Sequence, residues 1–116
     1  MQLVSVIIPC YNEQVRIRGL LAAIKTQTYP CNRMEVVIAD GGSTDQTRAE
    51  IDGFMQSSPD LRILLVENPQ RHIPTGLNLA IRASKGDIII RMDAHSLPYP
   101  DYIERCVEAL TNGLGE

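Results

Sequence analysis

Four short runs of apolar residues recur along the chain, and each is followed by a segment with apolar residues at helical spacing. The runs cover residues 4–9, 35–40, 62–67 and 88–90. They are rich in valine, isoleucine and leucine with little polar alternation, which is typical of parallel strands buried on both faces. The segments between them repeat apolar residues every three or four positions and therefore predict helices.

Local signals mark the ends of these helices. Asn12 is a candidate N-cap for the first helix, and Ser43 followed by Gln46 has the pattern of a capping box for the second. In the third helix we expect Ile81 to point inward, and a glycine, Gly86, follows its end. Each strand is thus predicted to lead into a helix of its own.

Strict alternation of strands and helices predicts an α/β fold in which a parallel sheet lies between layers of helices. We expect a Rossmann-like architecture with four parallel strands in a three-layer sandwich. The 116 residues suit one domain, covering residues 1–116 without a linker or repeat.

Polar side chains follow every predicted strand at its carboxyl end. They are Tyr11, Asn12 and Glu13, then Asp40, then Glu67 and Asn68, and last Asp93 and His95. Because the carboxyl ends of parallel strands meet at one edge of a sheet, we expect one crevice to collect them. A carboxylate and an imidazole two residues apart could hold a divalent cation there.

Several of these residues also have a plainer interpretation. Asp40 could cap the following helix, Glu13 could complement a helix dipole, and His95 could be a hydrogen-bonded structural residue. Arg71 and His72 read as a solvated loop pair, with contact between Arg71 and a phosphate as the alternative.

Composition excludes several classes of function. The net charge is −3 and the basic residues form no cluster, so we expect no nucleic-acid partner. No apolar run approaches the roughly 20 residues of a membrane span, and the three cysteines match no zinc or disulfide pattern, which favours a reducing compartment. Neither a dinucleotide-binding fingerprint nor a P-loop is found.

The motifs at the strand ends resemble those of family 2 glycosyltransferases, the inverting enzymes of the GT-A fold. Residues 4–13, 40–47, 76–87 and 93–95 resemble successive motifs of that family, in the family's order. The amino-acid sequences of residues 75–78 and 91–95 are most similar to those of bacterial exopolysaccharide glycosyltransferases of the succinoglycan type.

The resemblance implies roles for individual residues on the nucleotide side of the cleft. Pro9, Tyr11 and Glu13 would line the cleft, with Tyr11 flanking the base or ribose. Asp40 would accept a hydrogen bond from a nucleobase N–H such as that of uracil, because an ionised carboxylate only accepts.

On the phosphate side, Asp93 would approach the ribose or a metal ion, and His95 stands where the family's metal-binding aspartate is usual. Mg²⁺ prefers oxygen ligands and Mn²⁺ tolerates an imidazole better, so the resemblance implies Mn²⁺ or Mg²⁺. Whether His95 ligates the ion directly stays open.

The implied function is binding of a nucleotide-sugar donor, a UDP-sugar, for inverting transfer to a glycan or lipid-linked acceptor in polysaccharide synthesis. The family's catalytic base lies on a later segment, so we expect no catalytic residue here. The chain is expected to be truncated before the acceptor-binding half, to bind nucleotide weakly and not to transfer sugar. The resemblance also implies a cytoplasmic location, at the inner face of the membrane in the full-length protein.

Two alternatives come from other classes. The chain could be a non-catalytic module whose open sheet edge pairs with a second copy as a homodimer. It could also be a nucleotidyltransferase, although the glycine-rich, lysine-containing first loop of those enzymes is absent.

Overall fold

The computed structural model describes residues 2–112. Its strands are β1 (Val4–Cys10), β2 (Met34–Asp40), β3 (Arg62–Glu67) and β4 (Ile88–Arg91). Its helices are α1 (Ile17–Lys25), α2 (Thr47–Ser57), α3 (Ile73–Ala83) and α4 (Tyr102–Thr111), with a short 3-10 turn, η1 (Cys31–Arg33), before β2. The strands begin and end within a residue of their predicted limits.

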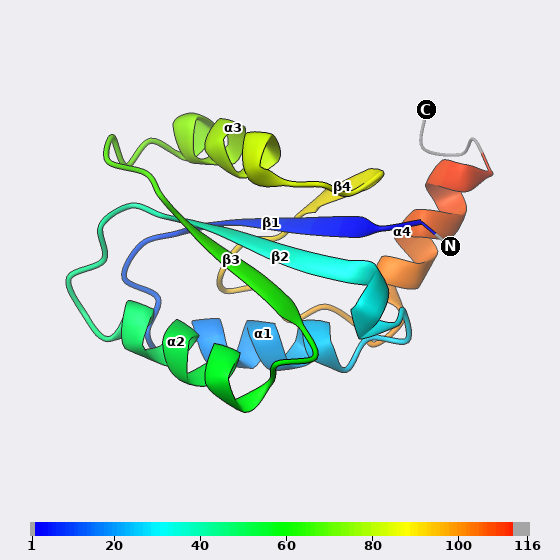
Figure 1. The fold of residues 1–116 in the computed structure, drawn as a ribbon, viewed down its shortest axis with the longest axis horizontal. Helices are drawn as coiled ribbons and strands as arrows, with labels where there is room; N and C mark the ends of the chain where they lie inside the picture. Colours follow the sequence, from blue (N-terminus) through cyan, green and yellow to red (C-terminus); the bar gives the residue numbers. More distant parts are fainter. Residues whose placement is uncertain (1, 113–116) are drawn as a thin grey trace.

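The four strands form one parallel sheet in the order β3-β2-β1-β4 (Figure 1). The helix α3 covers one face, while α1 and α2 cover the opposite face. The predicted α/β fold with three layers is confirmed. No helix within residues 2–112 has the length and apolar character needed to cross a membrane.

The larger core lies on the face covered by α1, α2 and the start of α4. Its strand residues alternate along the chain, as Val4, Val6 and Ile8 do in β1, and they pack against side chains such as Leu20 and Ile51. The smaller core under α3 contains Ile7, Val37, Ala39 and Ala80. Both faces of the central strands are therefore buried.

The edge strand β4 is buried on one face only, contrary to the prediction. Ile88 and Ile90 join the main core, but Ile89 is 41% exposed. Ile81 of α3 is 43% exposed, so its predicted inward orientation is wrong as well. The reason is that α3 packs over β1, β2 and β3 and leaves the outer face of β4 uncovered.

The predicted helix caps are also wrong. The N-cap residue of α1 is Arg16 and that of α2 is Gln46, and neither makes a side-chain capping hydrogen bond. Asn12 and Ser43 lie in the loops before these helices, where they make other contacts.

Candidate functional site

A cavity of about 230 Å³ opens at the carboxyl ends of the strands. Five of the six residues to which the family resemblance assigns a role line it, namely Pro9, Tyr11, Glu13, Asp93 and His95, whereas Asn12 and Glu67, also expected in the crevice, do not. Its lining also includes Cys10, Ala39, Gly41, Asn68, Arg71, Ile73 and Ala94. The cavity is smaller than the roughly 300–1,000 Å³ that is typical of small-molecule sites.

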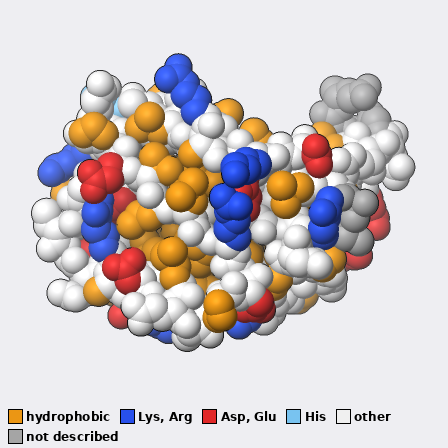
Figure 2. All heavy atoms as spheres, viewed as in Figure 1, with side chains coloured by type: hydrophobic (Ala, Val, Ile, Leu, Met, Phe, Trp, Pro, Cys, Tyr) orange, Lys and Arg blue, Asp and Glu red, His pale blue; other side chains and the backbone are white. Residues whose placement is uncertain are grey.

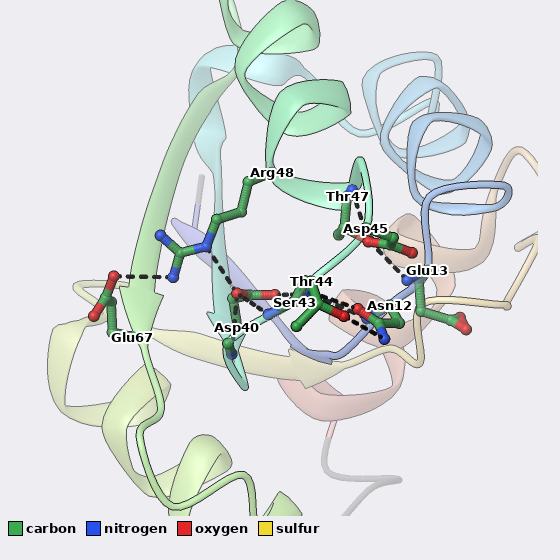
Figure 3. Close-up of polar contacts among 10 residues, drawn as sticks. Asn12, Glu13, Asp40, Ser43, Thr44, Asp45, Thr47, Arg48 and Glu67 are labelled. Atoms are coloured by element: carbon green, nitrogen blue, oxygen red, sulfur yellow. Dashed lines mark hydrogen bonds and ion pairs between the residues drawn. The ribbon is translucent and has the colours of Figure 1, made fainter.

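The loops that follow β1 and β2 are joined by reciprocal hydrogen bonds (Figure 3). The Asn12 backbone N–H donates to Ser43 Oγ at 2.9 Å, and the Thr44 N–H donates to Asn12 Oδ1 at 2.8 Å. Asn12 has a φ of 50°, in the left-handed region that asparagine tolerates better than most residues. These two hydrogen bonds fix the path of the backbone on both sides of Asn12, and therefore the positions of Tyr11 and Glu13.

Glu13 is held by its backbone, while part of its side chain lacks a partner. Its N–H donates to Thr47 Oγ1 at 2.8 Å. Its carboxylate oxygen Oε2 is buried and accepts no hydrogen bond within residues 2–112. Glu13 as a residue also lines the cavity.

Asp40 is the predicted site residue that does not line the cavity. Its side chain is fully buried, and its Oδ2 accepts hydrogen bonds from the N–H groups of Gly42 (3.2 Å) and Ser43 (3.0 Å). Arg48 Nε donates to the same oxygen at 2.9 Å, and the Ser43 hydroxyl donates to Oδ1 at 2.5 Å (Figure 3). The structure therefore gives Asp40 a structural role in this turn, and its predicted hydrogen bond to a nucleobase stays a prediction.

Two opposing influences act on the pKa of the Asp40 carboxyl. Burial raises the pKa, but the hydrogen bonds from Ser43 and Arg48 and the charge of Arg48 lower it further than burial raises it. The net pKa lies below the ordinary value, so this carboxylate is ionised at neutral pH.

Asp93 and His95 follow β4 and line the same cavity. Asp93 Oδ1 accepts a hydrogen bond from Arg91 Nη2 at 3.1 Å, and the Asp93 side chain is 46% exposed. No group of three or more His, Cys, Asp or Glu side chains suited to a metal ion is found within residues 2–112. A cation held here would take ligands from Asp93 and His95 and the rest from a bound diphosphate or water.

Two further lining residues, Asn68 and Arg71, have no role from the family resemblance, although Asn68 was expected in the crevice and contact with a phosphate was the alternative for Arg71. The Arg71 guanidinium lies over the ring of Tyr11, 5.1 Å from its centroid, and Arg71 has a φ of 61°. The sequence signal for Asn68 was its place at a strand end. Arg71 had no such signal, because its placement depends on a left-handed turn and on a partner in another loop.

Cys10 lines the cavity but is unsuited to nucleophilic chemistry. Burial first, and then the nearby carboxylates of Asp40, Glu13 and Asp45, raise the pKa of the Cys10 thiol to about 12. A neutral thiol is a poor nucleophile, so Cys10 acts as a small buried hydrophobe.

Comparison with known proteins places this site in context. The model of the family described as glycosyl transferase family 2 matches residues 5–114. The chain is 41% identical over 111 residues to the succinoglycan biosynthesis protein ExoA of Rhizobium meliloti, covering 93% of this chain and 33% of that protein. It is 36% identical to the glycosyltransferase AglE of Haloferax volcanii, covering 93% of this chain and 35% of that protein.

Among solved structures, the mannosyltransferase PcManGT from Pyrobaculum calidifontis, solved with GDP-Man and Mn²⁺, matches with a TM-score of 0.89 at 37% identity. The match covers 94% of this chain and 32% of that one. The chain thus spans about a third of the length of these relatives. Because the family model matches nearly the whole chain and the fold agrees, this chain belongs to glycosyl transferase family 2.

Proposed function

We propose that this chain forms the donor-binding part of an inverting glycosyltransferase and binds a nucleoside diphosphate sugar at the carboxyl ends of its strands. The observation that carries the proposal is the cavity itself, because it gathers residues from the ends of all four strands, including Gly41 after β2. Tyr11 comes from the end of β1, Asn68 from the end of β3, and Asp93 with His95 from the end of β4.

The residues that line the cavity suit different parts of such a donor. The Tyr11 ring is 43% exposed and offers a flat apolar surface to a base or ribose. Asp93 and His95 would hold a divalent cation beside the diphosphate. A bound cation would neutralise the charge that develops on the departing nucleoside diphosphate.

Support for the cation comes from its ligands and from a relative. A carboxylate with an imidazole suits Mn²⁺ better than Mg²⁺, and PcManGT was solved with Mn²⁺. The acceptor would be a growing glycan or a lipid-linked sugar, and the name of the Rhizobium relative refers to succinoglycan biosynthesis.

Isothermal titration calorimetry with UDP and with GDP, in Mn²⁺ and in EDTA, tests the proposal. We expect binding that requires a divalent cation, and is therefore lost in EDTA, and that weakens at least about tenfold in Asp93→Ala, since even indirect changes around a metal cost 10- to 100-fold in affinity. Asp52→Ala, an exposed position on α2, is the matched control and leaves binding unchanged. Binding that ignores both Mn²⁺ and Asp93 would contradict the proposal.

A second titration asks whether His95 contacts the cation. His95→Asp replaces an imidazole with the oxygen ligand that Mg²⁺ prefers, so UDP binding should become stronger in Mg²⁺ relative to Mn²⁺. An unchanged Mg²⁺-to-Mn²⁺ ratio in this variant would show that His95 does not ligate the ion.

A further inference from the structure

The amino end of the sheet contains a buried polar network that holds the start of β4. The Ser5 hydroxyl donates to Glu35 Oε2 at 2.6 Å, and the backbone N–H of Lys85 donates to the same oxygen at 2.6 Å. The Gly86 N–H donates in turn to Ser5 Oγ at 2.8 Å. Ser5 is fully buried and Glu35 is 2% exposed. Burying a carboxyl group costs desolvation energy, and here its hydrogen bonds join β1 and β2 to the residues that lead into β4.

The hydrophobic pattern of β4 does not by itself fix the register of this edge strand. Every second residue along this segment is small or apolar, namely Gly86, Ile88, Ile90, Met92 and Ala94. A shift by one residue would turn Arg91 and Asp93 inward, which opposes it. A shift by two residues toward the amino end would keep an apolar side chain at each buried position of β4. Backbone hydrogen bonds form in either register.

Loops on both sides of β4 leave room for such a shift, and the shift would matter for the cavity. Residues 84–87 and 92–101 lie outside the helices and strands. The shift would lengthen the first connection, shorten the second and carry Asp93 roughly 6–7 Å from its place, at about 3.3 Å per residue. The register of β4 therefore decides whether Asp93 and His95 reach the cavity.

Gly86 distinguishes the two registers because it lies against β1. A Cβ at this position would lie 2.7 Å from the Ser5 backbone nitrogen and 3.0 Å from the Leu3 carbonyl oxygen. In the shifted register Ile88 would take this place, and its Cβ would not fit. The close approach follows from the network, because the Gly86 N–H is drawn to the Ser5 hydroxyl, which Glu35 holds.

We propose that Glu35, through Ser5 and Gly86, fixes the register of β4 and so acts as a positioning residue for Asp93 and His95, which follow the opposite end of that strand. A buried polar group used in this way favours one arrangement over its alternatives. The consequence for nucleotide binding rests on the proposed donor-binding function, whereas the register of β4 does not.

NMR on the ¹³C,¹⁵N-labelled chain tests the register directly. Val6 pairs with Ile90, so the wild type should show nuclear Overhauser effects between these two residues and one set of β4 signals. Glu35→Met removes the acceptor, and we expect a second set of signals from at least about a tenth of the molecules, with Val6 next to Met92. A folded Glu35→Met that keeps only the wild-type contacts, or that loses them without gaining the new ones, overturns the proposal.

Three more variants keep the test decisive. Glu35→Gln retains an acceptor oxygen and loses only an ion pair at 3.8 Å with the exposed Arg62, so it should keep the wild-type register. Ile51→Val destabilises the main core without touching the network and should keep the register too. A shifted register in Ile51→Val would show that any loss of stability permits the shift, and would overturn the role of Glu35. Ser5→Ala breaks the link to Gly86 and should give the second set of signals, which decides the matter if Glu35→Met does not fold.

Titration of the same variants with UDP in Mg²⁺ separates this proposal from the donor-binding function. If Asp93 and His95 reach the cavity only in the wild-type register, the dissociation constant of Glu35→Met rises by the reciprocal of the fraction that NMR finds in that register. Normal affinity beside a populated shifted register overturns the positioning of Asp93 and His95. A wild type that binds no nucleotide overturns the donor-binding function, and NMR still decides whether Glu35 fixes the register.

Discussion

At the scale of single residues, Asp40 stabilises the loop on which the cavity depends. Its buried carboxylate joins the turn at Gly42 and Ser43 to the start of α2 through Arg48. Arg48 also pairs with Glu67 at the end of β3, at 2.9 Å. Asp40 therefore ties together the carboxyl ends of two neighbouring strands.

Asp40→Asn tests this role through its pH dependence. We expect the variant to lower the free energy of unfolding at pH 7 by about 1–3 kcal/mol, because Arg48 loses its buried partner but remains partly solvated. The folded-state pKa of Asp40 lies below the ordinary value of 3.8, so its contribution is complete above that value. The contribution is lost as the pH falls through the lower folded-state pKa. Urea denaturation should give a smaller difference between variant and wild type at pH 3 than at pH 7.

Arg71→Gly separates binding from stability. Glycine adopts the φ of 61° without strain, which offsets the lost contact with Tyr11 and the greater freedom of the unfolded chain. We expect the free energy of unfolding to stay within about 1 kcal/mol of wild type, while UDP binding weakens. A variant that unfolds much more easily yet binds normally would contradict a contact between Arg71 and the nucleotide.

Membership of the site could be predicted for residues whose position depends only on where a strand ends. Tyr11, Glu13 and Asp93 follow strands, and the structure brings them to one cavity. The acceptor role for Asp40 came from the family resemblance and stays a prediction, and no local pattern indicated its partner Arg48, eight residues along the chain. Arg71 depends on a contact with Tyr11 in another loop, which no local pattern encodes.

At the scale of elements, strands could be predicted closely and helix starts could not. Buried valine and isoleucine runs mark β1 and β2 because both faces are covered. Asn12 has good N-cap chemistry, yet it pairs with Thr44 in a neighbouring loop. Exposure of Ile89 follows from strand order, since β4 lies at an edge that α3 leaves uncovered.

A pair of glycine substitutions tests how β4 is joined to the sheet. The Gly86 N–H donates to Ser5 Oγ at 2.8 Å, and a Cβ there would lie 2.7 Å from the Ser5 backbone nitrogen. We expect Gly86→Ala to lower the free energy of unfolding by about 1–3 kcal/mol. Gly19→Ala, in α1 with open space around its Cβ position, should raise it by about 0.5–1 kcal/mol. Thermal or urea unfolding that gave the two variants the same sign would contradict this packing.

At the scale of the whole molecule, the two edges of the sheet differ. The β3 edge is bounded by Arg62 and Glu67, both more than half exposed. Figure 2 shows the side of the molecule on which β3 lies: hydrophobic side chains gather between α3 and α2, and charged side chains surround them. The β4 edge carries Ile89 and has a charged residue, Arg91, at one end only. Charged residues discourage pairing between sheet edges, so the β4 edge is the more open to a second copy.

Light scattering over a range of concentrations tests this edge. We expect the mass to rise with concentration in the wild type and to stay at the monomer value in Ile89→Lys, because a lysine on the edge opposes pairing. Leu64→Lys on β3 is the matched control and should behave like the wild type. A wild-type protein that stays monomeric at high concentration would count against edge pairing.

The most direct test of the donor site is a map of nucleotide binding by NMR on the ¹⁵N-labelled chain. Titration with UDP or GDP in Mg²⁺ should shift the amide signals of Gly41, Asn68 and Asp93 at the carboxyl ends of the strands. Those of Glu35 and Lys85, at the opposite end of the sheet, should not move. Replacing Mg²⁺ by Mn²⁺ should broaden signals most strongly around Asp93. Shifts that cluster at Glu35 and Lys85, or no shifts at all, would contradict the proposed donor site.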